Sequence, residues 1–560
     1  MLETEDNLQS EIKANFHQCK VLLNCYIREF CQEHPETISI EPDEGTFKLR
    51  FRASEVQICG RLAFFSAAGE HEYESFYVDE GKALHYADLV RWIIQELKQH
   101  DPSITAERSA DFAAKTENSF HKLALFLKHA AGQEVGDYLS SEQSLIYGHP
   151  FHPFPKNTMG FSEQEVMAYC PELHTSFQLC YFAVREDVFA EEWLADERRM
   201  DFYEYVDVQV RSMLKDKGRR YSILPVHPWQ YEHVQTVQAV QEYIDQDKLI
   251  PLGSFGPMVY PTSSVRTVYI PEMQCNIKLS LNIQITNLLR NNDREQMRRT
   301  MDAANYLLRK SCFAQEPNTR IAYETGVCTC RFANDDITKL FTLAYRAVDF
   351  DESSTYVLSS LVEVPLAGAR PRLFSLIGSQ DINKWFRRYL QISLLPIVRI
   401  AEQEGIHFEA HLQNSLLTIK DGMPHTFMIR DLEGVSVDRE KAGTDEEKNG
   451  PLFYAKEEAW ARTAYYFFVN HLGSLIHAIA YGARAPEERY WKLVQEVLMK
   501  ENARQENEFV HYLLNADAFY AKKNLISCLA GDSERPSYIP VVNVMKRIGS
   551  ETNADDKQLA

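Results

Sequence analysis

A segment rich in histidine and proline, residues 148–160, carries side chains suited to binding phosphate or carboxylate groups. Its prolines hold the backbone extended, so that His149, His152 and Lys156 project from a stiff loop. Donors held in fixed positions lose little entropy when an anion binds. A metal site is less favoured, because no third ligand is apparent nearby. The structural alternative is that the histidines only hydrogen-bond their own loop.

A second group of cations and hydroxyls follows further along the chain. If the chain there is a strand, alternation places Ser264 and Arg266 on one face. If the segment beyond Lys278 becomes helical, Thr286 and Arg290 are four residues apart and share a face. Such a set would suit a polyanion, and surface solvation of each side chain is the alternative.

The third group combines carboxylate, amide and imidazole side chains. Strand alternation puts Glu409, His411 and Gln413 on one face, Asn414 starts the next turn, and Asp431 ends the following strand. Mg²⁺ favours one or two carboxylate or amide oxygens beside substrate phosphates, so the pattern predicts a magnesium site. Pairing of these polar groups across two strands is the structural alternative.

Protein kinases use a related pair, an Asn and a later metal-binding Asp, which makes a phosphotransferase the natural competing hypothesis. The sequence has no glycine-rich phosphate loop of the GxGxxG or Walker type. Nucleotide phosphates would therefore have to be held by side chains.

The amino-acid composition limits the kinds of partner that the protein is expected to bind. The 560 residues include 60 Lys and Arg against 80 Asp and Glu, a formal net charge of −20. This charge repels nucleic acid and anionic membranes, so neither is expected as a partner. The most apolar helical stretch, 464–480, is interrupted by polar residues and is short of the ~20 that a membrane span needs. An acidic start without an apolar run predicts a cytoplasmic protein.

Hydrophobic periodicity predicts an α+β fold in three regions, divided near residues 140 and 337. The N-terminal region, 1–140, is expected to mix helices and strands, at 12–33, 47–51, 56–65, 86–100 and 112–131. The middle region, 141–337, is expected to hold an antiparallel sheet, with strands at 178–184, 221–224, 264–270 and 275–281. The C-terminal region, 338–560, is expected to be mainly helical, at 382–404, 456–483 and 487–516, with strands at 408–419 and 426–432.

Taken in order, the three groups resemble the motifs of the NRPS-independent siderophore synthetases, the aerobactin-synthetase family. The matching patterns are the His-Pro-x-His-Pro-x-x-Lys loop, the Ser-x-Arg-Thr segment with a following Lys and Thr-x-x-x-Arg, and the Glu-x-His-x-Gln-Asn and Arg-Asp-x-Glu-Gly segments. The resemblance spans residues 148–434. It implies a cupped-hand architecture of thumb (1–140), fingers (141–337) and palm (338–560), with the cleft between fingers and palm, and a homodimer.

The resemblance also implies an ATP-dependent ligase of siderophore biosynthesis. A carboxylate of citrate, or of a citrate derivative, would attack the α-phosphorus of ATP and release pyrophosphate. An amine or hydroxyl nucleophile would then displace AMP. A polyamine, an amino acid and a hydroxamate remain open as nucleophiles, and so do free citrate and a citryl-monoamide as acyl donor.

Residue roles follow from the matching positions. The implied ATP-binding residues are Lys156, Ser264, Arg266, Thr267, Lys278 and Gln413. The implied citrate-binding residues are Thr286, Arg290, His411 and Gln413. The implied Mg²⁺ ligands are Glu409, Asn414 and Asp431. Catalytic roles are implied for Arg290, His411, Lys278 and His152.

Two other classes of function compete with this interpretation. A small-molecule kinase would transfer the γ-phosphate of ATP and release ADP. A non-catalytic citrate- or nucleotide-binding protein would keep the arginine clusters but would turn nothing over.

Overall fold

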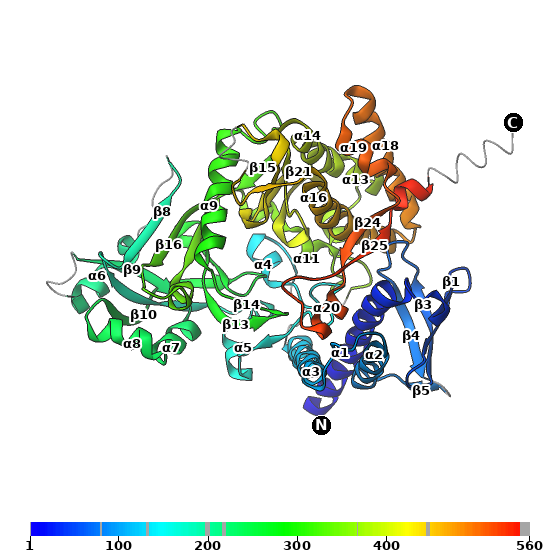
Figure 1. Ribbon diagram of the computed structural model, residues 1–560, viewed down its shortest axis with the longest axis horizontal. Coiled ribbons are helices and arrows are strands. Elements are labelled where there is room, and N and C mark those ends of the chain that lie inside the picture. The colour runs from blue at the N-terminus through cyan, green and yellow to red at the C-terminus, as the bar shows by residue number, and fades with distance from the viewer. Residues whose placement is uncertain are drawn as a thin grey trace.

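The computed structural model describes residues 2–78, 81–129, 134–195, 202–214, 220–366, 368–443 and 449–548. Figure 1 shows three regions: N-terminal helices and a sheet in blue, a large sheet with short helices in green at the left, and a helix-rich region in yellow to orange above. The fold mixes helices and sheets, as the sequence predicts.

The N-terminal region packs three helices against a five-stranded antiparallel sheet. The side chains of β2 alternate between the two faces of the sheet. Phe47, Leu49 and Phe51 are buried on one face, and Lys48 and Arg50 are exposed on the other. The elements are α1 (Leu2–Tyr26), a π-helical turn η1 (Ile27–Cys31), β1 (Ile38–Glu41), β2 (Thr46–Phe51), β3 (Val56–Phe64), β4 (Glu72–Val78), β5 (Lys82–Ala83), α2 (Tyr86–His100) and α3 (Ala106–His129).

The middle region is built on an eight-stranded sheet of order β8-β16-β17-β12-β11-β10-β7-β9, in which every neighbouring pair is antiparallel. Its strands are β7 (Phe177–Arg185), β8 (Phe189–Trp193), β9 (Tyr221–Val226), β10 (Leu249–Pro261), β11 (Thr267–Ile270), β12 (Cys275–Lys278), β16 (Glu324–Cys330) and β17 (Leu343–Ala347). The antiparallel sheet predicted for residues 141–337 is confirmed.

Smaller elements surround this sheet. A three-stranded sheet joins β6 (Thr158–Met159), β13 (Leu281–Ile285) and β14 (Leu288–Arg290). The helices are α4 (Tyr138–Gln143), α5 (Glu163–Tyr169), α6 (Tyr203–Leu214), α7 (Pro228–Gln235), α8 (Gln238–Asp245), α9 (Arg294–Arg309) and α10 (Asp335–Thr338).

The C-terminal region surrounds a four-stranded sheet of order β15-β21-β20-β18 with helices. The strands of the region are β15 (Thr319–Ala322), β18 (Thr355–Val357), β19 (Ile406–His407), β20 (Ser415–Lys420), β21 (Met423–Arg430), β22 (Ser436–Asp438), β23 (Phe453–Tyr454), β24 (Ala518–Lys522) and β25 (Tyr538–Val542). The helices are α11 (Leu358–Val362), α12 (Leu373–Ile377), α13 (Ile382–Ile392), α14 (Leu394–Glu404), α16 (Lys456–Thr463), η12 (Ala464–Leu472), α17 (Gly473–Ala483), α18 (Glu487–Arg504), α19 (Glu508–Asn515) and α20 (Asn524–Ala530).

Each region has its own hydrophobic core, but the cores cross the predicted boundary near residue 140. Phe151 and Phe154 of the histidine-proline loop are buried in the N-terminal core, together with Leu281 of β13 and Leu525 of α20. The loop therefore rests on the N-terminal region although it follows the boundary in sequence. The division into three domains stays a prediction.

Three local predictions are wrong. Residues 264–266 form a tight turn, in which the Arg266 amide donates to the Ser264 carbonyl at 2.8 Å, and the strand begins at Thr267. The predicted helix at 286–290 is a hairpin, because β13 and β14 pair across a two-residue turn. The predicted strand at 408–419 begins at Ser415 and follows a 3₁₀ turn, η9 (Leu412–Asn414).

Candidate active site

An ion pair joins the middle and C-terminal sheets. Lys278 ends β12, and its Nζ lies 3.0 Å from Asp431 Oδ1 and 3.3 Å from Glu433 Oε2. Asp431 directly follows β21 of the other sheet. Burial alone would raise the pKa of Asp431, but Lys278 and Arg346 outweigh it and hold that pKa below its ordinary value. Two predicted site residues far apart in sequence are thus brought together.

Arg266 holds the β13–β14 hairpin against the turn that precedes β11. Its Nη1 donates to the carbonyl of Arg290 at 2.8 Å and to Asn292 Oδ1 at 2.7 Å. The side chain is buried, and burial lowers its pKa. The predicted shared strand face of Ser264 and Arg266 does not form, because Ser264 Oγ instead accepts the amide of Thr267 at 3.2 Å within the turn.

Arg290 meets Thr286 across the hairpin. Its Nη2 donates to Thr286 Oγ1 at 3.0 Å and to the carbonyl of Ile285 at 3.1 Å. Burial, and then the charge of Arg266, lower the pKa of Arg290 to about 10, so the guanidinium stays charged at neutral pH. Asp431 and Glu433 act electrostatically on both guanidinium groups, but among the described residues no carboxylate forms an ion pair with either. Positive charge is therefore available to an anion.

The backbone is strained at three points around this charge. Val265, Thr286 and Asp431 have φ values of 66°, 57° and 68°, in the left-handed region that side-chain-bearing residues rarely adopt. Each of these three residues lies within one of the predicted motifs. Strained residues persist only where the surrounding structure holds them, and they gather at functional sites.

The histidine-proline loop, residues 148–160, contacts the β13–β14 hairpin through His152. His152 is buried beside Asn287 and Arg290, and burial lowers its pKa to about 4. His149 and His152 each accept a backbone amide of the loop through Nδ1, at 3.0 Å from Phe151 and 3.3 Å from Phe154. The structural alternative, in which the histidines hydrogen-bond their own loop, is therefore correct for Nδ1 of each ring. The neutral tautomer then carries its proton on Nε2, where it is a hydrogen-bond donor.

Lys156 is placed differently from the expectation of a projecting side chain. It is 8% exposed, and its Nζ lies 2.7 Å from Glu172 Oε1 and contacts the Leu145 carbonyl. Its backbone amide donates to Ser119 Oγ of α3 at 3.1 Å. The proline-rich loop packs onto the N-terminal core and carries this lysine inward, so its charge is already balanced by an internal carboxylate.

Lys156→Ala is accordingly expected to destabilise the protein. Removing one partner of a buried ion pair leaves Glu172 uncompensated, at a cost of about 3 kcal/mol in the free energy of unfolding. Thermal and denaturant unfolding would measure this. Lys339→Ala, which removes an exposed ion pair with Asp336, is the matched control and should change stability by under about 1 kcal/mol. Unchanged stability together with a raised KM for ATP would contradict the expectation.

The third motif forms a turn that contacts the middle region. Asn414 Nδ2 donates to the carbonyl of Glu409 at 3.2 Å, and His411 Nδ1 accepts the Asn414 amide at 3.3 Å. Gln413 Nε2 donates to Ser263 Oγ at 3.3 Å, which links this turn to the one that bears Arg266. Burial lowers the pKa of His411, so the imidazole is neutral at pH 7.

Sequence reasoning missed three charged residues at this site. Arg462 of α16 donates from Nη2 to Glu409 Oε1 at 3.1 Å. Lys522, the last residue of β24, donates to Tyr466 OH at 3.1 Å and acts electrostatically on His411 and Glu409. Glu433 shares Lys278 with Asp431. A signal existed for Glu433, two residues after Asp431 in the same motif, but none for Arg462 or Lys522, which stand in no motif.

The donor set fits a divalent cation in part. Within the described ranges, no group of three or more His, Cys, Asp and Glu side chains could hold a metal ion by itself. Glu409 is paired with Arg462, and Asn414 with the Glu409 carbonyl, so the predicted ligands do not form a cluster. Asp431 and Glu433, however, converge on one ammonium group. Two carboxylates beside substrate phosphates are what Mg²⁺ commonly uses.

The N-terminal region braces two segments of this site through the π-helical turn η1. The Arg28 guanidinium lies 3.1 Å from the centre of the Phe151 ring in the histidine-proline loop. Glu29 accepts the amides of Leu525 and Ile526 at 3.0 and 2.9 Å, just after Lys522. Asn524 closes the link by donating to the Phe151 carbonyl at 2.8 Å. The N-terminal residues therefore support the site although they carry none of its motifs.

Comparison with known proteins tests the resemblance. Residues 137–347 match the IucA / IucC family, and residues 383–537 match the family described as "Ferric iron reductase FhuF-like transporter". In the segments of the chain that the structure describes, no helix is both long and apolar enough to cross a membrane.

Relatives match over nearly the whole chain. The L-2,3-diaminopropanoate–citrate ligase of Staphylococcus aureus is 32% identical, over 93% of this chain and 94% of its own. The spermidine–citrate ligase of Bacillus anthracis is 26% identical, over 94% and 96%. The ATP-bound aerobactin synthetase IucA from Klebsiella pneumoniae superposes with a TM-score of 0.84 at 22% identity, over 94% and 99%. The predicted resemblance is confirmed: the chain belongs to the IucA/IucC family of siderophore synthetases.

Proposed function

We propose that the protein is a ligase of siderophore biosynthesis that joins citrate to an amine at the expense of ATP. The observation that carries the proposal is a set of links between the middle and C-terminal regions: Lys278 pairs with Asp431, and Gln413 of the His411 turn bonds Ser263 of the turn that bears Arg266. Arg266 in turn holds the hairpin of Arg290. Support for citrate and for an amine comes from the relatives, since those named above ligate citrate to diaminopropanoate or spermidine. Homodimerisation stays a prediction.

The first chemical step brings two anions together. A citrate carboxylate oxygen attacks the α-phosphorus of ATP, a new P–O bond forms, and the bond to the pyrophosphate oxygen breaks. Arg290 and Arg266 would offset the repulsion between carboxylate and triphosphate, because guanidinium groups bind both kinds of oxygen. The side chains of Ser264, Thr267 and Lys278 are proposed to contact ATP, and Thr286, His411 and Gln413 to contact citrate.

In the second step the amine nitrogen attacks the activated carbonyl carbon. An amide C–N bond forms, AMP departs with the former carboxylate oxygen, and the nitrogen loses a proton. His411 suits the acyl site because its neutral ring, with Nδ1 engaged by Asn414, presents an Nε2–H donor to a carboxylate or carbonyl oxygen. Glu409, held by Arg462, is the nearby carboxylate for an ammonium group.

Mg²⁺ would be held by Asp431 and Glu433, while the other two predicted ligands, Glu409 and Asn414, are paired with Arg462 and with the Glu409 carbonyl. Bound there, it would neutralise phosphate charge as the α-phosphorus is attacked.

The test is a nucleotide-product assay. The purified protein is incubated with ATP, Mg²⁺ and citrate, with and without an amine from a panel of 2,3-diaminopropanoate, spermidine and ornithine. We expect AMP and pyrophosphate in equal amounts with at least one amine, together with a citryl-amide detected by mass spectrometry. ADP as the nucleotide product would establish the kinase alternative instead. Binding of citrate or ATP without any turnover would establish the non-catalytic alternative.

A further inference from the structure

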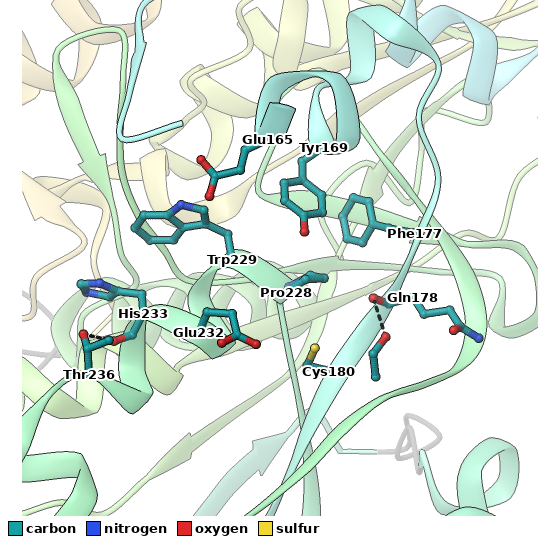
Figure 2. A pocket seen from close by; sticks show the side chains of 11 residues that line it. Glu165, Tyr169, Phe177, Gln178, Cys180, Pro228, Trp229, Glu232, His233 and Thr236 are labelled. Carbon is teal, nitrogen blue, oxygen red and sulfur yellow. Dashed lines mark hydrogen bonds between the residues drawn. The ribbon is translucent and has the colours of Figure 1, made fainter. Parts of the chain in front are cut away.

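A cavity of about 710 Å³ opens in the middle region, and none of its lining residues belongs to the candidate active site. It lies between α5, α7 and the strands β7 and β10, and Figure 2 shows its side chains. No residue of the three sequence motifs lines it, so the proposed ligase chemistry leaves this space unexplained.

Aromatic rings form one portion of the wall. The Trp229 ring stacks on His233, with ring centres 5.1 Å apart and planes at 19°. Tyr169 and Phe177 meet edge to face at 5.1 Å, and Phe177 is buried. In Figure 2 the Tyr169 hydroxyl points toward Pro228, and the Trp229 ring lies to its left in the view. Ring faces fixed in this way attract cations through their quadrupole.

Two carboxylates from different helices face the same space. Glu165 of α5 is half-buried, Glu232 of α7 is exposed, and both line the cavity. After burial and the effect of Cys180, both contribute to the raised pKa of Tyr169. The carboxylate of Glu165 has two oxygens, Oε1 and Oε2, and Oε2 accepts the Ser162 amide at 2.7 Å. In Figure 2 the carboxylate of Glu165 lies near the Trp229 ring and that of Glu232 lies below Pro228.

The described residues that line the cavity carry no full positive charge, although Lys122, outside the lining, acts electrostatically on Glu165. The lining holds neither Lys nor Arg. Its histidine, His233, has its pKa lowered by burial, which keeps the ring neutral at pH 7. The wall is therefore anionic and aromatic, the composition that recognises an organic ammonium ion rather than an anion or a neutral apolar ligand.

We propose that this cavity, lined by Glu165, Tyr169, Trp229 and Glu232, is a second binding site that takes an organic ammonium ion, preferably a short diamine. The two carboxylates would each pair with one ammonium group, while the rings of Tyr169 and Trp229 contact the methylene chain and the charged ends. No lining residue of this cavity belongs to the candidate active site, although His233 contacts Asn282 of β13, and the proposal does not rest on the proposed function.

The test is calorimetric titration of the full chain, without ATP or citrate, using putrescine as the probe. We expect saturable binding that weakens at least about tenfold in the Glu165→Gln/Glu232→Gln double variant, since both charge-assisted contacts are lost. Glutamine at position 165 still fits the capping box with Ser162, so α5 is retained. Glu163→Gln, on the same helix but outside the cavity, is the matched control and should bind as the wild type does.

A second variant separates the site from simple charge attraction. Trp229→Leu keeps both carboxylates and an apolar side chain but removes the ring face, and we expect it to weaken putrescine binding by about threefold or more. Melting temperatures check that each variant folds. Absence of putrescine binding in the wild-type protein would overturn the proposal. So would unchanged affinity in the double variant, because the probe would then bind elsewhere, including in the ligase cleft. The pyrophosphate assay reads the proposed function independently of both results.

Discussion

Arg290→Ala is expected to lower citrate-dependent pyrophosphate release by about a hundredfold or more. The Arg290 guanidinium is charged, half-buried and fixed by two hydrogen bonds to the turn at Thr286, so it needs little reorganisation when an anion arrives. Losing a charge-assisted contact to the attacking carboxylate and the α-phosphate is worth roughly 3 kcal/mol in the transition state. The measurement is the initial rate of pyrophosphate release at saturating ATP and citrate.

Two further variants show how the result for Arg290→Ala should be interpreted. Arg290→Lys keeps the charge but loses the planar fork, and it should recover only a fraction of the activity. Leu289→Ala removes the exposed neighbouring side chain in the same hairpin and should leave activity near the wild-type value. An Arg290→Ala protein that retains more than about a third of wild-type pyrophosphate release would show that this arginine does not contact the reacting groups.

Asp431→Asn is expected to raise the Mg²⁺ concentration needed for half-maximal activity by about tenfold, and to lower the maximal rate. The amide keeps the size of the side chain but loses the negative charge that draws a divalent cation and pairs with Lys278. The measurement is the initial rate as a function of Mg²⁺ at fixed ATP. Asn414→Ala should shift the same curve by less, because that amide already bonds the Glu409 carbonyl.

The structure supplies a control for this prediction. Glu433→Gln removes the other carboxylate that contacts Lys278, and a metal held by both should respond to each substitution in the same direction. Normal activity of Asp431→Asn with an unchanged Mg²⁺ dependence would mean that the carboxylate only orders the two sheets. A lower melting temperature with unchanged Mg²⁺ dependence would lead to the same conclusion.

The sequence alone was sufficient for the family and the mixed fold, while the roles of the site residues stay predictions. Its information lay in side-chain types at short spacing, such as Ser264 with Arg266 and Thr286 with Arg290, which no shift of the backbone can separate far. The helices and strands of 86–100 and 47–51 were equally readable, because burial of one face imposes a period on the sequence.

Spacing did not determine conformation. Thr286 and Arg290 were expected to meet on a helix, and they do meet, but across a hairpin, since a separation of four residues brings side chains together in both. The pairing of β13 with β6 and β14 selects the hairpin, and β6 lies more than a hundred residues earlier in the chain. Likewise, nothing local to Lys156 shows that packing of its loop carries it to Glu172.

Tertiary structure alone decided which distant residues complete the site. Arg462 and Lys522 stand in helical and strand segments without a motif, and they reach Glu409 and His411 only because α16 and β24 pack there. The cavity around Trp229 has the same origin, because its carboxylates come from two helices separated by more than one strand. Contacts between elements depend on which faces pack together. The periodicity of a sequence shows which face of an element is apolar, but it does not show which other element covers that face.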